Sequence, residues 1–451
     1  MMQVGLAEFG RVHVVPEAAI IAEKYLQEID LSSKLYWKDS YLQMNDSEVK
    51  AMAGAYKSTK NGKYYFGHFF LYNILTIPAH FFCKAAGIPP FRAMPVTNAL
   101  MVAALLFYLG LENRLSISAR LVGVLLAVFS PLSWYLDFKG PEVMTQAAVF
   151  AAMIGYLANR TLFPVTIITL CAMQNPSSGA FLLPVLGRLL INKNWKKLLL
   201  CCLIASFICL PIIFNLYHFG KPNIMASHAL HLQLLSGKRL WSAFFDLQQG
   251  MIVGFPFTMP LFLFLAIYAL FKWELSPLTW IPIVILMLLP LLAQGNWHPG
   301  QIRVLRYSAW AGMVFQAGVL WAFLNPSLFK FQNIVLFLVF ITMFYFIKTK
   351  FVFQQNYYYC EFNDTAKWFL RHYPDCYNPE IEIFAECTFK YEKDFSEDSL
   401  IIYQDPLTGD TAKVAVRRGI SEVFLRNILG EYAKSHNKRK NAGQGWEYLM
   451  H

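Results

Sequence analysis

Five polar patches interrupt an otherwise strongly apolar chain, and they hold the residue types that could do chemistry. They combine carboxylates, imidazoles, amides and an arginine, and ionisable groups of this kind at membrane depth are functional suspects because they are costly there. The patches cover residues 63–68, 137–142, 174–178, 246–250 and 296–306. Counting the apolar segments between them predicts that all five reach the same side of a membrane, as in an intramembrane enzyme or carrier.

The composition of the chain excludes an ordinary soluble globule. Of its 451 residues, 56% are hydrophobic and only 15% are charged, whereas a soluble domain has roughly a quarter charged residues. Ten apolar segments are mostly close to the ~20 residues that a helix needs to cross a bilayer. They are 93–111, 117–136, 143–157, 161–173, 179–191, 198–217, 251–271, 275–293, 307–323 and 331–347. The sequence therefore predicts an all-α polytopic membrane protein with about ten transmembrane helices.

The distribution of charge predicts an orientation. The formal net charge of +11 fits a topology signal better than nucleic-acid binding, because no recognisable nucleic-acid module accompanies it. Lysines at 193, 196 and 197 place the segment before residue 198 in the cytoplasm. Counting outward, residues 1–92 form an extracytoplasmic N-terminal segment, residues 93–348 the helix bundle and residues 349–451 a soluble extracytoplasmic α+β domain. The first residues predict no signal peptide, since Glu8 and Arg11 interrupt the apolar run.

The two polar regions carry weaker signals for individual elements. The N-terminal region predicts a helix over 16–28, a turn at Tyr64 and Tyr65, and an interfacial amphipathic helix over 69–86. The C-terminal region predicts helices over 364–372 and 420–435, and a strand over 399–403 that turns through 405–410 into 412–416. In an oxidising compartment two of three cysteines there could form a disulfide, the three being Cys360, Cys376 and Cys387.

The carboxylates of the patches each have a structural and a functional interpretation. Asp137 and Glu142 bracket Lys139 at the end of an apolar segment. Glu142 follows Pro141 and opens a helix, where the helix dipole favours a carboxylate, but an intramembrane role explains it equally well. Asp246 could be a helix cap, which is the favoured interpretation for this residue taken singly.

The patch at 296–306 has the spacing of an anion site. Arg306 stands where a span begins and could grip a lipid phosphate with a bidentate fork, with His298 as a nearby donor. The structural alternative is an arginine that snorkels from a helix end. In the first patch, His68 follows Tyr64 and Tyr65, which could equally form an interfacial aromatic belt.

Taken in order, these patches resemble motifs of the bacterial membrane glycosyltransferases of the C-type (GT-C) superfamily, which use polyprenyl-phosphate sugars. GKYYFGH at 62–68 resembles G-R-Y-Y-S-K-H, and SPLSWYLDFKGPE at 130–142 resembles S-P-L-x-F-Y-S-x-x-x-x-P-E. FDLQQGMIVGFP at 245–256 is similar to F-D-P-x-x-G-L-L-x-Y-x-P, and WHPGQIRVLRY at 297–307 to W-H-G-G-x-x-x-G-P-R-Y. The tail segment PDCYNPEIEIFAEC at 374–387 is similar to P-x-x-Y-N-P-x-x-E-x-F-x-x-R, with Cys387 in place of the arginine.

The resemblance implies a transferase that moves a sugar from a polyprenyl-phosphate donor to an envelope glycan or lipid, such as lipopolysaccharide, on the outer face of a bacterial inner membrane. It implies three sets of residues: catalytic carboxylates Glu17, Asp137 and Glu142; donor-phosphate ligands His68, His298 and Arg306; and substrate-groove residues Tyr64, Tyr65, Asp246, Trp297 and Tyr307. The expected partners are the lipid donor, the acceptor and membrane lipids, and not nucleic acid. No protein metal site and no cofactor are expected, beyond a divalent cation at most.

One part of the family pattern is missing. The family has an acidic pair at the outer end of its first span, and by count that pair falls on Val14 and Val15. Glu17 is the nearest substitute, with Asp30, Asp39 and Asp46 behind it, so either the chain starts late or it is a degenerate relative. The alternative function is a non-catalytic lipid-linked-sugar binder or flippase. An ion-coupled transporter predicts internal repeats, which the sequence does not show.

Overall fold

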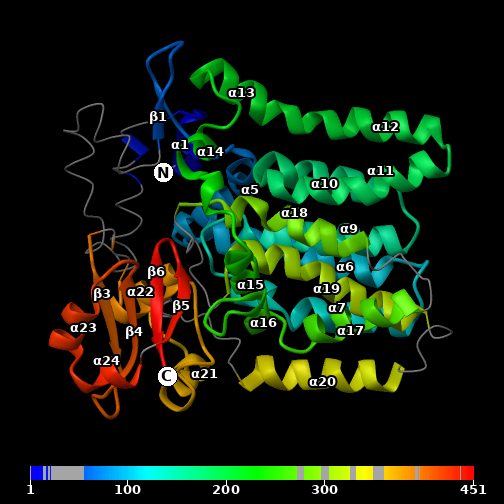
Figure 1. Cartoon of the computed structure of the whole chain (residues 1–451). Helices are drawn as coiled ribbons and strands as arrows, with labels where there is room; N and C mark the ends of the chain where they lie inside the picture. The colour runs from blue at the N-terminus through cyan, green and yellow to red at the C-terminus, as the bar shows by residue number, and fades with distance from the viewer. Residues whose placement is uncertain are drawn as a thin grey trace. The chain divides into compact units, whose positions relative to one another are not determined.

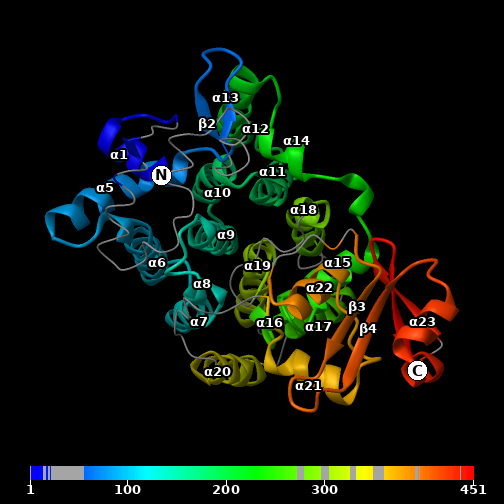
Figure 2. The same cartoon turned by 90° about the vertical axis from the view of Figure 1, so that its left-hand side faces the viewer.

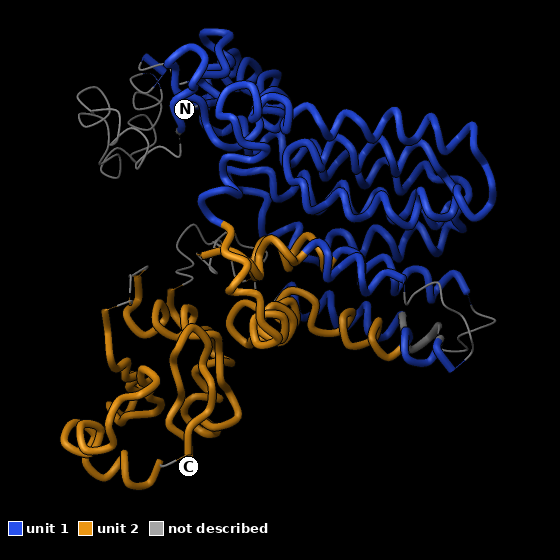
Figure 3. The backbone as a smooth tube through the Cα atoms, turned by 45° about the horizontal axis from the view of Figure 1, so that its top comes forward, with its two compact units in different colours: residues 1–229, 265–287, 313–353 blue, residues 230–264, 288–312, 354–451 orange. Residues whose placement is uncertain are grey.

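The structure of the protein is a computed structural model that describes residues 2–13, 17–18, 21, 55–271, 279–295, 304–325, 332–348, 360–391, 395, 397–436 and 438–451. These residues belong to two compact units (Figure 3). Unit 1 is Met1–Ala229, Leu265–Met287 and Met313–Phe353, and unit 2 is Leu230–Phe264, Leu288–Gly312 and Gln354–His451. The division differs from the three predicted regions, because the N-terminal segment packs with helices of the bundle, whereas the C-terminal domain packs with residues 230–264 and 288–312.

Unit 1 is almost entirely helical, and most of its helices run side by side in Figure 1. Its helices are α1 Met2–Phe9, α5 Leu71–Ala85, α6 Ala93–Leu111, α7 Ile117–Val128, α8 Pro131–Trp134, α9 Glu142–Leu157, α10 Leu162–Gln174, α11 Leu182–Ile191, α12 Trp195–Ala205, α13 Cys209–Phe219, α14 Ile224–Ala229 and α20 Gln332–Lys348. Three more helices divide between the two units: α17 Thr258–Phe271, α18 Trp280–Leu292 and α19 Arg306–Leu324. Each of the ten predicted apolar segments contains helix, but 117–136 is broken between α7 and α8, and 251–271 is broken between α16 Met251–Gly254 and α17.

Helix α9 is the buried centre of unit 1. Every residue from Glu142 to Gly155 is buried, and the helix packs against α6 and α10, as Figure 2 shows end-on. A helix that is apolar on all sides is stable only when neighbours or lipid cover it completely. The polar side chains at the start of α9 consequently lie inside the protein.

Three helical stretches within the described residues are long and apolar enough to cross a membrane, namely Pro90–Leu111, Trp195–Phe219 and Arg306–Leu324. Seven further apolar helices have only 10–17 residues. Helices of that length also occur as core helices of soluble proteins. Membrane-like helices are thus present, while the figure of about ten spans stays a prediction.

The N-terminal part of unit 1 contains two elements that the sequence did not predict. Strands β1 Ala55–Lys57 and β2 Tyr64–Phe66 pair antiparallel, so Tyr64 and Tyr65 lie in a strand and the predicted turn at these residues is wrong. The turn comes earlier, where Gly62 adopts a positive φ of 68°.

Helix α1 is tied to α5 because Glu8 accepts hydrogen bonds from Lys84 at 2.9 Å and lies 2.7 Å from His80.

Helix α5 confirms the helix predicted over 69–86, with Pro78 inside it. Of the helix predicted over 16–28, only residues 17, 18 and 21 are described, and all three are helical. Glu17 is exposed to solvent, whereas the next residue, Ala18, is buried.

The C-terminal part of unit 2 is the small α+β domain that the sequence predicts. A four-stranded antiparallel sheet has the order β3-β4-β6-β5, formed by β3 Leu400–Gln404, β4 Thr411–Arg417, β6 Trp446–Met450 and β5 Lys438–Gly443. One face packs Val414, Val416 and Leu449 against Leu425 of α23 Glu422–Leu429. On the other face Tyr448 contacts Phe384 of α22 Ile381–Phe389.

Several details of this domain confirm the sequence interpretation. Helix α21 Asp364–His372 and the β3–β4 hairpin lie where they were predicted. The helix predicted over 420–435 is broken at Gly430 into α23 and α24 Glu431–Ser435, because this glycine has a positive φ of 54°. The disulfide does not form: Cys360, Cys376 and Cys387 are all free thiols, and Cys376 is exposed whereas the other two are buried.

The close packing of Gly312 in α19 predicts that a larger residue at this position will lower the stability of the protein. A Cβ on Gly312 would lie 2.0 Å from the ring of Phe255, which is fully buried. Gly312→Ala should therefore destabilise the protein by about 1–3 kcal/mol through overpacking, measured by thermal unfolding in nanodiscs. The double variant with Phe255→Leu should recover part of the loss. Gly187→Ala in α11, where a new Cβ meets nothing within 4 Å, is the control and should be neutral or slightly stabilising.

Candidate functional site

The first group of candidate residues lies in unit 1, at the loop that joins α8 to α9. Asp137 accepts a hydrogen bond of 3.3 Å from Arg92, and both side chains are partly exposed. Lys139 places its ammonium 4.2 Å from the centre of the Phe91 ring. Asp137 and Lys139 of this loop thus lie near Arg92, which precedes α6. Of these three residues, the sequence interpretation named only Asp137 as a site residue.

Asn98 of α6 fixes the course of this loop. Its amide nitrogen donates to the carbonyl oxygens of Leu136 at 3.1 Å and Phe138 at 2.8 Å, and its amide oxygen accepts from the hydroxyl of Tyr72 at 2.8 Å. The backbone N–H of Tyr72 donates in turn to the side chain of Gln174 at 3.0 Å. Asn98 is completely buried, so its amide links α5, α6 and the loop. Sequence reasoning missed it, although an amide within an apolar span is a usable signal.

Glu142 begins α9 and is only 1% exposed. A Cβ on Gly140 would lie 2.3 Å from its Oε2 atom, so only a glycine leaves room for the carboxylate in this position. The phenol of Tyr72 is close enough to Glu142 to interact with it electrostatically. The structure thus places Glu142 in a buried polar group with Tyr72, Asn98 and Gln174, which is an arrangement that could bind or deprotonate a hydroxyl group.

The residues of the first sequence patch have a mostly structural role. Tyr65 is buried against Phe219 and Ile224, and its hydroxyl accepts a hydrogen bond from Asn61 at 2.9 Å. Tyr65 thus packs in this cluster, and its role in a substrate groove stays a prediction. Tyr64 is half-buried, His68 is exposed, and Gly67 is needed because a Cβ there would lie 2.4 Å from the sulfur of Met225.

The second group of candidate residues lies in unit 2, at the start of α19. Arg306 and Tyr307 are half-buried, and the guanidinium of Arg306 lies 5.7 Å from the centre of the Tyr307 ring. The hydroxyl of Tyr307 accepts a hydrogen bond of 3.1 Å from the side chain of Gln294. Trp297 and His298 lie outside the described residues. The described part of this motif therefore offers one guanidinium and one phenol at a helix N-terminus.

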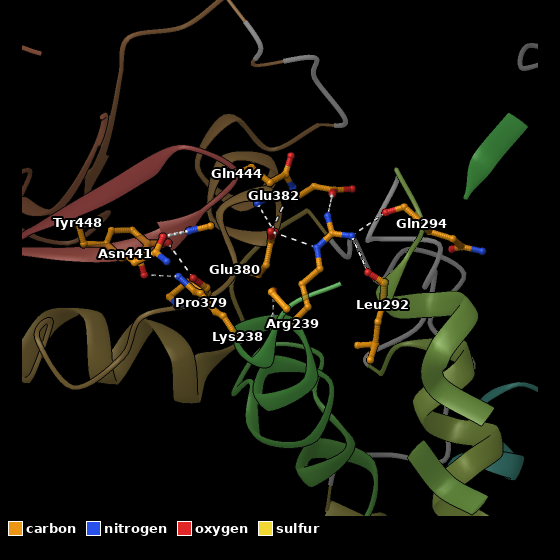
Figure 4. A network of polar contacts seen from close by, with 12 residues as sticks. Lys238, Arg239, Leu292, Gln294, Pro379, Glu380, Glu382, Asn441, Gln444 and Tyr448 are labelled. Carbon is orange, nitrogen blue, oxygen red and sulfur yellow. Dashed lines mark hydrogen bonds and ion pairs between the residues drawn. The ribbon is translucent and has the colours of Figure 1, made fainter. Parts of the chain in front are cut away.

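Gln294 also belongs to a buried ion cluster around Arg239 of α15 Gly237–Phe245 (Figure 4). Arg239 donates to the carbonyl oxygens of Leu292 at 3.2 Å and Gln294 at 2.7 Å, and it pairs with Glu380 at 3.6 Å and Glu382 at 3.7 Å. The arginine is 2% exposed. It joins α15, the end of α18 and the C-terminal domain within unit 2, and no sequence pattern predicts that this arginine is buried.

Asp246 is a capping residue. Its carboxylate accepts hydrogen bonds from the backbone N–H groups of Gln248 at 2.8 Å and Gln249 at 3.0 Å, and from the hydroxyl of Tyr377 at 3.3 Å. Burial raises the pKa of Asp246 from its usual value of 3.8 to about 6. Asp246 follows the end of α15 and caps a turn, whereas Gly250 precedes the next helix, α16, so the predicted cap at a helix entry is wrong. The groove role of Asp246 stays a prediction.

Within the described ranges, no group of three or more His, Cys, Asp or Glu side chains could hold a metal ion. The chemistry that these ranges offer is therefore that of single side chains: a buried carboxylate at Glu142, an arginine with a phenol at Arg306 and Tyr307, and the exposed cations near Asp137.

The buried cluster around Arg239 predicts a large stability effect. Arg239→Met should cost about 3–5 kcal/mol of unfolding free energy, because it leaves Glu380 and Glu382 buried without their cation. Adding Glu380→Gln and Glu382→Gln should restore part of that stability. Arg426→Met, which removes an exposed pair with Glu422, is the control and should change stability by less than about 1 kcal/mol. Equal effects of the two arginine substitutions would contradict the buried cluster.

The raised pKa of Asp246 predicts a pH effect with a definite sign. Because the pKa is higher in the folded state, the contribution of this group is fully present below about pH 4 and is lost as pH rises through about 6. The Asp246→Asn variant has no carboxyl group to titrate at this position and should not show this loss of stability. The unfolding free energy of the variant minus that of the unmodified chain should therefore rise by up to about 3 kcal/mol between pH 4.5 and pH 8. Thermal unfolding across this range measures it. Asp410→Asn, at an exposed carboxylate, should leave the pH dependence unchanged.

Comparisons of the chain with models of protein families, with curated proteins and with solved structures find no match in any of the three.

Proposed function

We propose that the chain is a membrane glycosyltransferase that moves a sugar from a polyprenyl-phosphate donor to an envelope glycan or lipid on the outer face of a bacterial inner membrane. The observation that most supports this proposal is the burial of Glu142, a carboxylate that is 1% exposed at the start of the central helix α9. Burying a carboxylate in an apolar bundle is costly. Such a residue is a functional candidate by default in a chain with membrane-like helices.

The residues can be assigned roles in a balanced reaction. The acceptor hydroxyl oxygen forms a bond to the anomeric carbon, while the bond from that carbon to the phosphate oxygen breaks. Glu142 takes the proton of the hydroxyl as general base, and the lipid phosphate leaves as an anion. Taken within unit 2 alone, Arg306 suits a lipid phosphate because its guanidinium can bind two phosphate oxygens at once. In this assignment Glu142 replaces Glu17 as the base, since Glu17 is exposed to solvent.

A second candidate function is a non-catalytic binder or flippase for lipid-linked sugars. The observation that favours it is in the sequence, where Val14 and Val15 occupy the positions of the acidic pair that the resemblance implies. A binder of this kind would still use the polar group around Glu142 in unit 1, but it would need no base.

The test is transfer of labelled sugar from a polyprenyl-phosphate sugar pool to envelope acceptors, with the full chain in nanodiscs. Glu142→Gln keeps the shape of the side chain and should lower transfer by about 100-fold or more, because a general base typically contributes 10²–10⁴-fold. Arg306→Ala should lower transfer by a similar factor. Glu17→Gln and the exposed tail variant Glu422→Gln are controls that should retain it.

The outcomes separate the two functions. Full transfer by the Glu142→Gln variant would refute its role as base, and loss only in Glu17→Gln would return that role to Glu17. Binding of the lipid-linked sugar by the unmodified chain, without any transfer, would support the binder.

A further inference from the structure

Gln146 of α9 is a buried amide that neither the fold nor the proposed reaction explains. Its side chain is fully buried, and neither its nitrogen nor its oxygen has a hydrogen-bond partner within the protein. An unsatisfied buried polar group costs about 1–3 kcal/mol. Apolar side chains of similar size would fill the same place in α9 without that cost.

The neighbouring amides show that unpaired atoms are not the rule at this end of unit 1. Asn98 uses both its nitrogen and its oxygen, and Gln174 accepts from the backbone of Tyr72. Asn175 donates to the hydroxyl of Thr145, which is the residue directly before Gln146. The unpaired amide of Gln146 therefore stands out against three paired ones close to it in the fold.

The position of Gln146 on α9 puts it with Glu142. The two residues are four apart, so they lie on the same face of the helix one turn from each other. Helical side chains lean toward the helix N-terminus, and the amide of Gln146 accordingly extends over the turn that begins with Glu142. Together they present one carboxylate and one complete amide inside the bundle.

This pair selects for a particular ligand chemistry. A carboxylate only accepts hydrogen bonds, whereas a glutamine amide both donates and accepts. A phosphate would be repelled by Glu142, and a cation would leave the amide N–H groups unsatisfied. Two neighbouring hydroxyl groups satisfy both partners, because one can donate to the carboxylate while the other accepts from the amide nitrogen and donates to the amide oxygen.

We propose that Gln146 is a specificity-determining residue that binds, together with Glu142, two adjacent hydroxyl groups of a sugar ring. This inference deepens the proposed function and rests on it only for the identity of the lipid that carries the sugar. In this proposal, the two side chains of α9 recognise the sugar ring and do not bind its phosphate.

The test compares two kinds of probe on the full chain in nanodiscs. One is the bare lipid, undecaprenyl phosphate, and the other is a panel of undecaprenyl-phosphate glucose, mannose and galactose. The unmodified chain should bind at least one sugar-bearing lipid more tightly than the bare lipid. Gln146→Leu should remove about 10-fold or more of that preference, while binding of the bare lipid stays unchanged. Its unfolding temperature should stay the same or rise, because an unpaired amide is replaced by an apolar group of similar size.

A matched control comes from α19 in the same unit. Gln316 is also fully buried with neither amide atom paired. Gln316→Leu should have the same effect on unfolding temperature and none on the preference for the sugar. Gln146→Met serves as a second variant if the leucine variant does not fold.

Three results would overturn the inference. These are a preference that survives in the folded Gln146 variants, a preference lost equally in Gln316→Leu, and an unmodified chain that does not discriminate between the two probes. Absence of transfer does not bear on it: a chain that binds the sugar through Gln146 but transfers nothing would refute the proposed glycosyltransferase and leave the binding site standing.

Discussion

The constraint on which this structure depends is that a polar group inside an apolar helix bundle is costly unless it finds a partner there. Asn98 meets it with three hydrogen bonds, to the carbonyl groups of Leu136 and Phe138 and from the hydroxyl of Tyr72. Those bonds fix the loop that leads into α9. The position of Glu142, and with it the whole candidate site of unit 1, follows from one buried amide that an apolar residue could not replace.

In unit 2 the same constraint applies to a full charge. Arg239 cannot lose its proton, so its burial requires anions and acceptors on several sides. Glu380 and Glu382 supply the charge, and the carbonyl groups of Leu292 and Gln294 at the end of α18 supply the remaining acceptors. Since Gln294 also donates to Tyr307, the contacts of one arginine reach the helix that begins with Arg306. This arginine therefore helps to position a candidate residue that it does not touch.

What the sequence could and could not predict follows from the range of the interactions. Local patterns located the ten apolar segments, α21 and the β3–β4 hairpin, because each depends on periodicity or on a turn of a few residues. Strand β5 was missed because Lys438, Arg439 and Lys440 form a charge run that is typical of loops. The burial of Tyr65 could not be predicted, because it depends on Phe219, about 150 residues away. Asn98 and Arg239 were missed for the same reason, since their partners are distant in sequence.

The exposure of the acidic residues is what singles out Glu142 among them. If the helix dipole alone placed a carboxylate at the start of α9, an exposed position would serve, as Glu422 shows at the start of α23 with 69% of its side chain exposed. Glu142 is buried, and it lies beside Tyr72, in a position kept open by Gly140 and one turn from the unpaired amide of Gln146. Stability requires none of these three features, whereas a site that binds hydroxyl groups uses all of them.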